Sequence, residues 1–310
     1  MQHLASVVLL VLALGACSDD QPTPSTPPAP ESGDACGPDS CAPVADAGPP
    51  SRACADGCYL SEICRDEACV PGPLEEMLPP PPQGVPGAPS AYARVAEAAD
   101  LFEGRNAGGQ TGDFIIGNDR VRYIIERAGR RGAGLTPFGG NLIDAQSMDR
   151  PGVEELMKVI PLINLGLTGQ FDEVRVLEDG SDGGAAVILA VGEDTLWDAV
   201  DLNGLVGRFN LLGFDVNADL DLMIGAVYAL APGQTSLRVT YTLWNQGVDG
   251  IETPVGIVVD PRGPVHSYTP TRGYGDNSFG EIFGGADDVP YFGYHGDDLV
   301  YGFVPLHPEG

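Results

Sequence analysis

The chain has little positive charge with which to attract an anion. Its 310 residues include 16 Lys and Arg against 44 Asp and Glu, which gives a formal net charge of -28, and Lys158 is the only lysine. Affinity for nucleic acids comes mainly from clustered Lys and Arg that release counterions from the phosphates. A field of this sign repels a polyphosphate. We therefore expect no nucleic-acid partner.

Short catalytic motifs are also missing. The sequence contains no Gly-x-Ser-x-Gly, no His-Glu-x-x-His and no phosphate-binding loop, which are the patterns that mark several classes of hydrolase and nucleotide-binding enzyme. Nothing else in the sequence pairs a nucleophile with a base. We expect a protein that is not an enzyme as it stands.

Metal ligands are few and dispersed. His266 and His295 could meet Asp260, Asp276 or Asp297 around a metal ion. Isolated histidines in loops are more often solvated or hydrogen-bonded than bound to a metal. We therefore expect no metal site, with His266, His295 and Asp297 as weak candidates.

Acidic loops offer oxygen ligands for calcium. Three such loops occur, at residues 178–184, 286–288 and 296–298. They lack the regular Asp-x-Asp-x-Asp-Gly array, and Asp-Gly pairs are common simply as turns. We expect no cofactor, with calcium as the alternative.

A long apolar run lies at the N-terminus. Leu4–Leu14 is about half as long as the roughly 20 residues of a transmembrane helix, and its dimensions are those of a cleavable signal core. Residues 14–17, Leu-Gly-Ala-Cys, resemble the lipobox of bacterial lipoproteins, in which the signal is cut before the cysteine and the thiol carries lipid. This implies a signal peptide over residues 1–16, lipidation of Cys17 and a membrane anchor. The alternative is an ordinary secretory signal that happens to hold a cysteine. Residues 1–3 lack the Lys or Arg that usually precedes a signal core, which is a departure from the pattern.

The location that this implies is the cell envelope of a Gram-negative bacterium, at the outer membrane or the cell surface. Six further cysteines agree with export, since a clustered, even set in an exported chain indicates disulfides. They are Cys36, Cys41, Cys54, Cys58, Cys64 and Cys69. Zinc would need paired Cys-x2-Cys spacings. We expect a disulfide-rich module over residues 36–70, whose pairing the spacing does not select.

Proline-rich segments flank this module. Residues 17–35 hold five of the 28 prolines and residues 71–90 hold eight. Such segments favour extended polyproline II and act as spacers. We expect a tether before the module, a linker after it, and a folded domain over residues 91–310.

This last region reads mainly as β-strands. Residues 114–116 and 120–125 predict a hairpin whose turn uses positive-φ positions, and residues 174–176 and 186–191 predict a second pair. Residues 237–243 alternate strictly, with Leu237, Val239, Tyr241 and Leu243 on one face, and follow an alternating strand at 220–224. Short helices are expected at 91–101 and 153–159. The fold class is a large antiparallel β-sandwich.

Four stretches carry a family resemblance: residues 112–122, 137–145, 241–245 and 301–303. They resemble the N-terminal β-region of large exported bacterial lipoproteins, some of which continue into a metallohydrolase domain of the polymerase-and-histidinol-phosphatase (PHP) type. The resemblance implies a fold like the galactose-mutarotase supersandwich, and carbohydrate binding. The hydrolase's His-x-His ligands do not occur in this sequence. One alternative is therefore the accessory portion of such a hydrolase, truncated before its catalytic domain.

Candidate ligand-binding residues follow from charge and aromatic character. Arg120 and Arg122 lie on one strand face and could hold an anionic sugar or a carboxylate. Trp244, Tyr291 and Tyr294 could stack on a sugar ring. The plain alternatives are a solvated hairpin face for the arginines and a core or rim position for Trp244.

The sequence as a whole predicts a lipid-anchored envelope protein whose β-sandwich binds a ligand without catalysis. The partner would be a glycan or another envelope protein. A structural or adhesive envelope component is the remaining alternative.

Overall fold

The computed structural model describes residues 8–15, 53–104, 107–130, 136–152, 156–164, 166–197, 220–261, 266–270, 273–276, 291–295 and 300–306. The fold is mainly β, as the sequence predicted. The first elements are β1 (Val8–Gly15), the 3-10 helix η1 (Cys54–Asp56), β2 (Glu62–Arg65), β3 (Ala68–Pro71), α1 (Pro73–Glu76), β4 (Tyr92–Val95) and the 3-10 helix η2 (Ala98–Asp100).

The later elements are all strands. They are β5 (Phe114–Gly117), β6 (Val121–Ile125), β7 (Leu142–Ser147), β8 (Leu156–Ile163), β9 (Leu167–Asp179), β10 (Ala186–Leu196), β11 (Leu222–Leu230), β12 (Ser236–Asn245), β13 (Val255–Pro261), β14 (His266–Thr269), β15 (Gly273–Asp276), β16 (Phe292–His295) and β17 (Val300–Leu306). Among the described residues no helix is long and apolar enough to cross a membrane.

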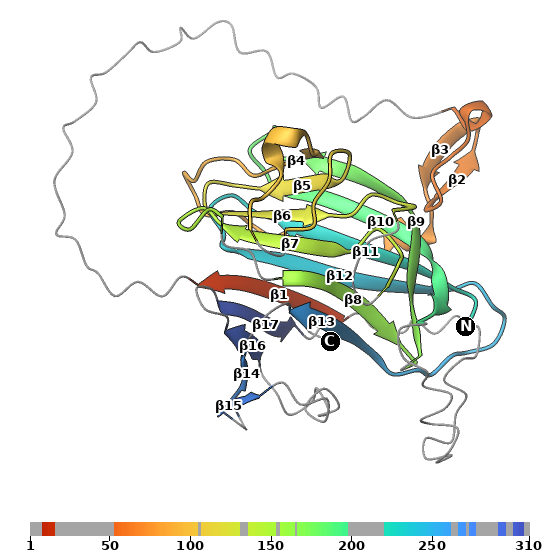
Figure 1. Ribbon diagram of the computed structural model, residues 1–310. Helices are drawn as coiled ribbons and strands as arrows, with labels where there is room; N and C mark the ends of the chain where they lie inside the picture. Colours follow the sequence, from red (N-terminus) through yellow and green to blue (C-terminus); the bar gives the residue numbers. More distant parts are fainter. Residues whose placement is uncertain are drawn as a thin grey trace, which may run out of the picture.

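One 15-stranded sheet contains every described strand except β2 and β3. Its order is β15-β14-β16-β17-β1-β12-β11-β10-β9-β8-β7-β6-β5-β4, with β13 paired to β8, and each described pair is antiparallel. The path doubles back, because β4 and β5 lie close to β9 and β10 although several strands separate them along the sheet (Figure 1). The result is the two-layered, sandwich-like arrangement that the alternating pattern predicted.

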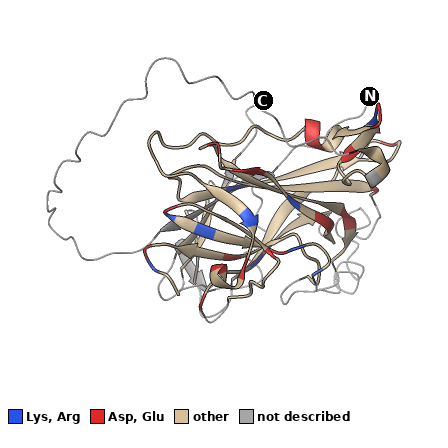
Figure 2. Cartoon of the chain, turned by 90° about the horizontal axis from the view of Figure 1, so that it is seen from above, with Lys and Arg blue, Asp and Glu red and all other residues tan. Residues whose placement is uncertain are grey.

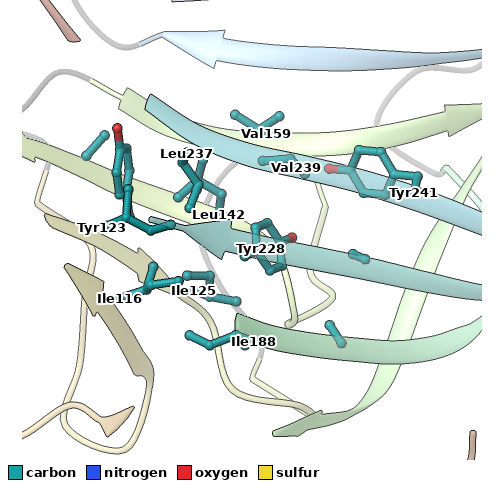
Figure 3. Packing of buried hydrophobic residues seen from close by; sticks show 14 of the residues in the cluster. Ile116, Tyr123, Ile125, Leu142, Val159, Ile188, Tyr228, Leu237, Val239 and Tyr241 are labelled. Atoms are coloured by element: carbon teal, nitrogen blue, oxygen red, sulfur yellow. The ribbon is translucent and has the colours of Figure 1, made fainter. Parts of the chain in front are cut away.

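The main core lies between these two layers. Ile116, Tyr123, Leu142, Ile188 and Tyr228 pack there, each 1% exposed or less (Figure 3). They come from β5, β6, β7, β10 and β11, so residues more than a hundred positions apart meet in one cluster. Removing this apolar surface from water is the dominant favourable contribution to folding.

Strand β12 shows how the sequence pattern becomes packing. Leu237, Val239, Tyr241 and Leu243 face the main core and are 4% exposed or less, which confirms the predicted strand and its inward face. The other face of β12 is covered too, since Thr240 and Thr242 are 1% exposed. A strict alternation therefore does not mark a face that is open to water here.

The proline-rich segment supplies part of this second cover. Leu74 of α1 is 1% exposed and packs with residues of β10 and β11. Farther along, Val85 N donates to Pro232 O (2.9 Å) and Arg238 donates to Pro80 O. Residues 73–85 thus run along the sheet instead of standing off as an extended spacer, because one leucine and several backbone groups find partners there.

The predicted hairpin of β5 and β6 is confirmed, but its turn differs. No residue from 117 to 120 has positive φ. Instead Asn118 Oδ1 accepts hydrogen bonds from the N–H groups of Arg120 (2.8 Å) and Val121 (3.0 Å). Its Nδ2 donates to Ala231 O and Gln234 O, in the turn between β11 and β12. One asparagine side chain closes one hairpin and ties it to another, so the backbone needs no left-handed residue.

Both helix predictions were wrong in the described residues. Residues 156–163 form β8, paired with β13, and residues 92–95 form β4, with only η2 helical nearby. Val159 and Ile160, adjacent in β8, are both fully buried. A short apolar run that is covered on both sides has no alternation, so its pattern does not distinguish a strand from a helix.

The cysteine module is a disulfide-bonded hairpin. Cys54 bonds to Cys64 and Cys58 to Cys69, which confirms these four cysteines as disulfide residues. Cys64 and Cys69 face each other across β2 and β3. The predicted sites Cys17, Cys36 and Cys41 lie outside the described residues.

Arg175 of β9 joins this module to the large sheet. Its side chain lies over the ring of Tyr59 (4.3 Å to the centroid) and 3.9 Å from Glu62, both in the module. It also pairs with Glu75 of α1 and with Glu173 on its own strand. Arg175 is only 15% exposed, so these charges are held with limited screening.

Strand β1 lies inside the sheet. It pairs antiparallel with β12 on one side and with β17 on the other, so that Leu10 faces both Val239 and Pro305 (Figure 1). The segment that the sequence predicts as the core of a signal peptide is therefore paired on both edges.

Candidate functional site

A buried ion pair joins β8 to the end of β6. Lys158 is fully buried and its Nζ lies 2.7 Å from Glu126 Oε2. The same Nζ donates to the carbonyl oxygens of Thr136 (2.9 Å) and Phe138 (3.1 Å). Burial raises the pKa of Glu126 to about 7, although Lys158 opposes the shift, and burial lowers the pKa of Lys158.

The backbone around Glu126 fixes this geometry. Glu126 N donates to Asn141 O (2.9 Å), and Gly140 N donates to Glu126 O (3.0 Å). Gly140 has φ 77°, and a Cβ there would lie 2.4 Å from Phe171 Cβ. Only glycine fits both the backbone angle and the close approach. The loop that brings Phe138 to Lys158 therefore depends on residue 140.

A second buried ion pair adjoins the first. Arg130 is 7% exposed and donates to Asp113, which is fully buried, and to Gly108 O. Its Nε also lies 3.8 Å from Glu126 Oε1. The four charged groups therefore form one connected set, the buried ion network, of Asp113, Glu126, Arg130 and Lys158. Two carboxylates balance two cations in it.

Asp144 of β7 completes the buried polar region. It is fully buried and accepts hydrogen bonds from Gly108 N (2.9 Å) and Gly109 N (2.7 Å). Burial raises the pKa of Asp144 to about 6, against the lowering effect of those two N–H groups. Asp144 and Arg130 therefore hold the 108–109 loop from two sides.

A hollow of about 410 Å³ opens beside this network. It is lined by Gly129, Arg130, Pro137, Phe138, Gly139, Gln170, Phe171 and Asp172. Gln170 and Asp172 are exposed residues of β9, whereas Phe171 between them is buried. The lining thus combines apolar surface, an amide, a carboxylate and glycine backbone. The buried ion network lies next to it. A mixed lining of this kind suits a small ligand that offers both hydroxyl and C–H groups.

The predicted arginine candidates lie on the β5–β6 hairpin. Arg120 is exposed, with its Nε 3.7 Å from Asp119. Arg122 donates to Gln146 and lies over the ring of Phe102, 5.1 Å from its centroid. Neither lines the hollow. Basic residues are few in the described chain and lie among acidic ones (Figure 2).

The predicted aromatic candidates are spread over other elements. Trp244, near the end of β12, packs against the cluster that contains Leu74. Tyr291 stacks on Tyr268, with ring centroids 5.9 Å apart, and Tyr294 packs edge-on against Phe303. The structure thus places the five candidates on β6 and its turn, on β12 and at β16. Their role in binding stays a prediction.

The weak metal candidates are partly brought together. His266 of β14 and His295 of β16 are direct cross-strand partners, whereas Asp260 belongs to β13 and Asp297 lies outside the described residues. In the described part of the chain, one set of three ligand atoms lies within 4.8 Å, the sulfurs of Cys54, Cys58 and Cys69. All three are in disulfides and so cannot act as thiolate ligands.

Sequence reasoning missed the buried ion network. A usable signal was present in Lys158, the only lysine, which stands between Met157 and Val159 in an apolar run. A charge in such a run must be exposed, or buried with a partner. The partner itself could not be chosen from 44 acidic residues.

The comparisons with known proteins add no identification, because no family model, no curated protein and no solved structure matches this chain.

Proposed function

We propose that this chain is a lipid-anchored protein of the bacterial cell envelope that presents its β-domain as a non-catalytic binding module for a carbohydrate. The observation that carries the binding function is the hollow lined by residues 129–130, 137–139 and 170–172. The anchor would be a lipid on Cys17.

Export is supported by the cysteine chemistry. The bonds Cys54–Cys64 and Cys58–Cys69 persist in oxidising compartments, outside the reducing cytosol. The Leu-Gly-Ala-Cys sequence at residues 14–17 supplies the acylation signal. Both features agree with a protein that matures beyond the inner membrane.

A carbohydrate ligand is supported by the lining of the hollow. Gln170 and Asp172 offer donors and acceptors for hydroxyl groups, and Gln170 Nε2 already lies 3.4 Å from Asp172 Oδ1. Phe138 and Pro137 offer apolar surface for the C–H face of a sugar ring. The net charge of -28 disfavours an anionic ligand at this surface, so the sugar would be neutral.

A non-catalytic role is supported by the burial and the contacts of the two acidic residues near the hollow, Glu126 and Asp144. Glu126 and Asp144 have raised pKa values, as acid–base catalysts often do. Both are nevertheless buried, and neither lines the hollow. Glu126 is held by Lys158, and Asp144 by backbone N–H groups. These acids act within the protein framework, where a substrate has no contact with them.

The binding function is tested with the full protein extracted from the membrane of its host. A panel of neutral oligosaccharides would be screened and the best one titrated by calorimetry against wild type, Gln170→Ala and Asp172→Ala. Loss of one or two hydrogen bonds predicts affinity weakened about tenfold or more in each variant. Glu178→Ala, an exposed acid eight residues beyond Gln170 along β9 and outside the hollow, is the matched control and should bind normally.

Two results would overturn this proposal. Binding that is equal in all four proteins would place the ligand elsewhere. An absence of saturable sugar binding would leave a structural or adhesive role. The anchor is tested separately, since Cys17→Ser should release the protein from the membrane fraction and remove the mass of the lipid.

A further inference from the structure

The structure aligns two of the chain's four histidines across neighbouring strands. His266 in β14 is the direct antiparallel partner of His295 in β16. On the other side of β14, His266 is the direct partner of Asp276 in β15. Three positions that carry metal-ligating residue types thus form one row across three adjacent strands (Figure 1).

The two histidines lie on the outer face of the sheet. In β16, Phe292 and Tyr294 face the core, where Phe292 stacks on fully buried Phe303 with centroids 4.8 Å apart. Side chains alternate along a strand, so His295 points to the opposite face. His266 is exposed and His295 is half-buried, which leaves both imidazoles within reach of solvent ions.

Direct cross-strand partners suit a shared metal ion. Their Cβ atoms lie about 4.5–5.5 Å apart, so two imidazole rings can converge on an ion with metal–nitrogen distances of about 2.0–2.1 Å. We propose that His266 and His295 form a divalent transition-metal site of the kind that binds Zn²⁺. Water would complete the coordination shell.

The two imidazole ligands distinguish this site from the unspecific binding of cations by the carboxylates of an acidic protein. Imidazole favours Zn²⁺, Cu²⁺ and Ni²⁺, whereas exposed carboxylates favour Mg²⁺ and Ca²⁺. A chain with a net charge of -28 will hold some of the latter ions loosely. A large excess of Mg²⁺ should therefore displace unspecific Zn²⁺ and leave the histidine site filled.

The test is a Zn²⁺ titration of the full, disulfide-bonded protein in excess Mg²⁺, with a chromophoric chelator as competitor. We expect one equivalent of tightly bound Zn²⁺ per chain. His266→Ala and His295→Ala should each weaken it about tenfold or more. His307→Ala, which changes the number of histidines equally but lies outside the row, is the matched control.

A second measurement guards against misfolding of the variants. With Cu²⁺ as the probe, electron spin-echo spectra of the wild type should show two coordinated imidazoles, and those of either single variant should show one. The proposal is overturned if wild type binds no Zn²⁺ in excess Mg²⁺. It is equally overturned if the His266→Ala and His295→Ala variants bind Zn²⁺ as tightly as the His307→Ala control.

Discussion

Replacing Lys158 by methionine should destabilise the protein strongly above neutral pH. Methionine keeps most of the volume of the lysine stem, so packing in β8 is largely preserved. The change removes the cation 2.7 Å from Glu126 and the donor to the Thr136 and Phe138 carbonyls. What remains is a buried carboxylate whose nearest cation, Arg130, is 3.8 Å away and already engaged by Asp113.

The size of the effect follows from the burial of both partners. Lys158 and Glu126 are each 1% exposed or less, so solvent does not screen them. Removing one member of a buried ion pair costs about 3–5 kcal/mol, because the other charge is left uncompensated. The double variant Lys158→Met/Glu126→Gln carries no orphaned charge, and we expect its free energy of unfolding to lie within about 2 kcal/mol of wild type.

The pH dependence has a definite sign. The folded-state pKa of Glu126, about 7, lies above its ordinary value of 4.5, so the folded protein holds a proton that the unfolded chain releases. Its contribution to stability is complete below about pH 4.5 and is lost as pH rises through about 7. Without Lys158, which lowers this pKa, the window extends to higher pH. The penalty of Lys158→Met should therefore be small at about pH 5 and large at about pH 8.

Urea unfolding followed by far-ultraviolet circular dichroism at both pH values measures these differences, with disulfides intact. The reasoning is refuted if Lys158→Met loses less than about 1 kcal/mol at the higher pH, or if the double variant is less stable than the single one there. A penalty that does not change between the two pH values would show that Glu126 is not the group responsible.

Three further changes test other parts of the structure. Asp144→Asn should flatten the decrease of unfolding free energy between about pH 4 and pH 6, since the raised pKa of Asp144 contributes stability at low pH that is lost through that window; denaturant unfolding across pH checks it. Leu74→Ala should cost about 2–5 kcal/mol in the same assay, although it changes a residue of the proline-rich segment, because Leu74 is 1% exposed against the sheet. Cys58→Ala/Cys69→Ala should destabilise the small hairpin by about 2–4 kcal/mol, seen as new proteolytic cleavage within residues 53–71 while the circular dichroism of the large sheet is unchanged.

Local pattern was sufficient for the strands whose two faces differ in hydrophobicity. Residues 237–243 alternate between apolar and polar side chains. The apolar face that this alternation predicted is the face that packs against the main core. The pattern failed for residues 156–163, where β13 pairs on one side and both faces are covered, so that the run is apolar on both faces apart from Lys158. Whether such a run is strand or helix depends on neighbours about a hundred residues away, which periodicity does not contain.

The candidate site was less accessible to prediction. Arginine and aromatic residues were predicted to bind a ligand because of their charge and their rings, yet the ion network beside the hollow is buried. Arg130 and Asp113 meet because the pairing of β5 with β6 sets Phe114 opposite Ile125, which brings Asp113 to the residues that follow β6. His266 and His295 were named as metal candidates from the sequence alone. Their alignment as direct partners on neighbouring strands, 29 positions apart in the chain, depends on the register of the sheet and could not be read from the sequence.

The position of β1 bears directly on the proposed removal of the signal peptide, because β1 is part of the segment that would be cut off. Since β1 is antiparallel to both β12 and β17, those two strands run in the same direction, about 10 Å apart across it. Strand β1 ends at Gly15, just before the predicted cleavage point. Removing residues 1–16 would therefore open the sheet in its interior rather than trim a loose end. Both β12 and β17 would then lose the partner strand that they share. Cleavage before Cys17 would therefore change the strand pairing within the sheet as well as the location of the protein.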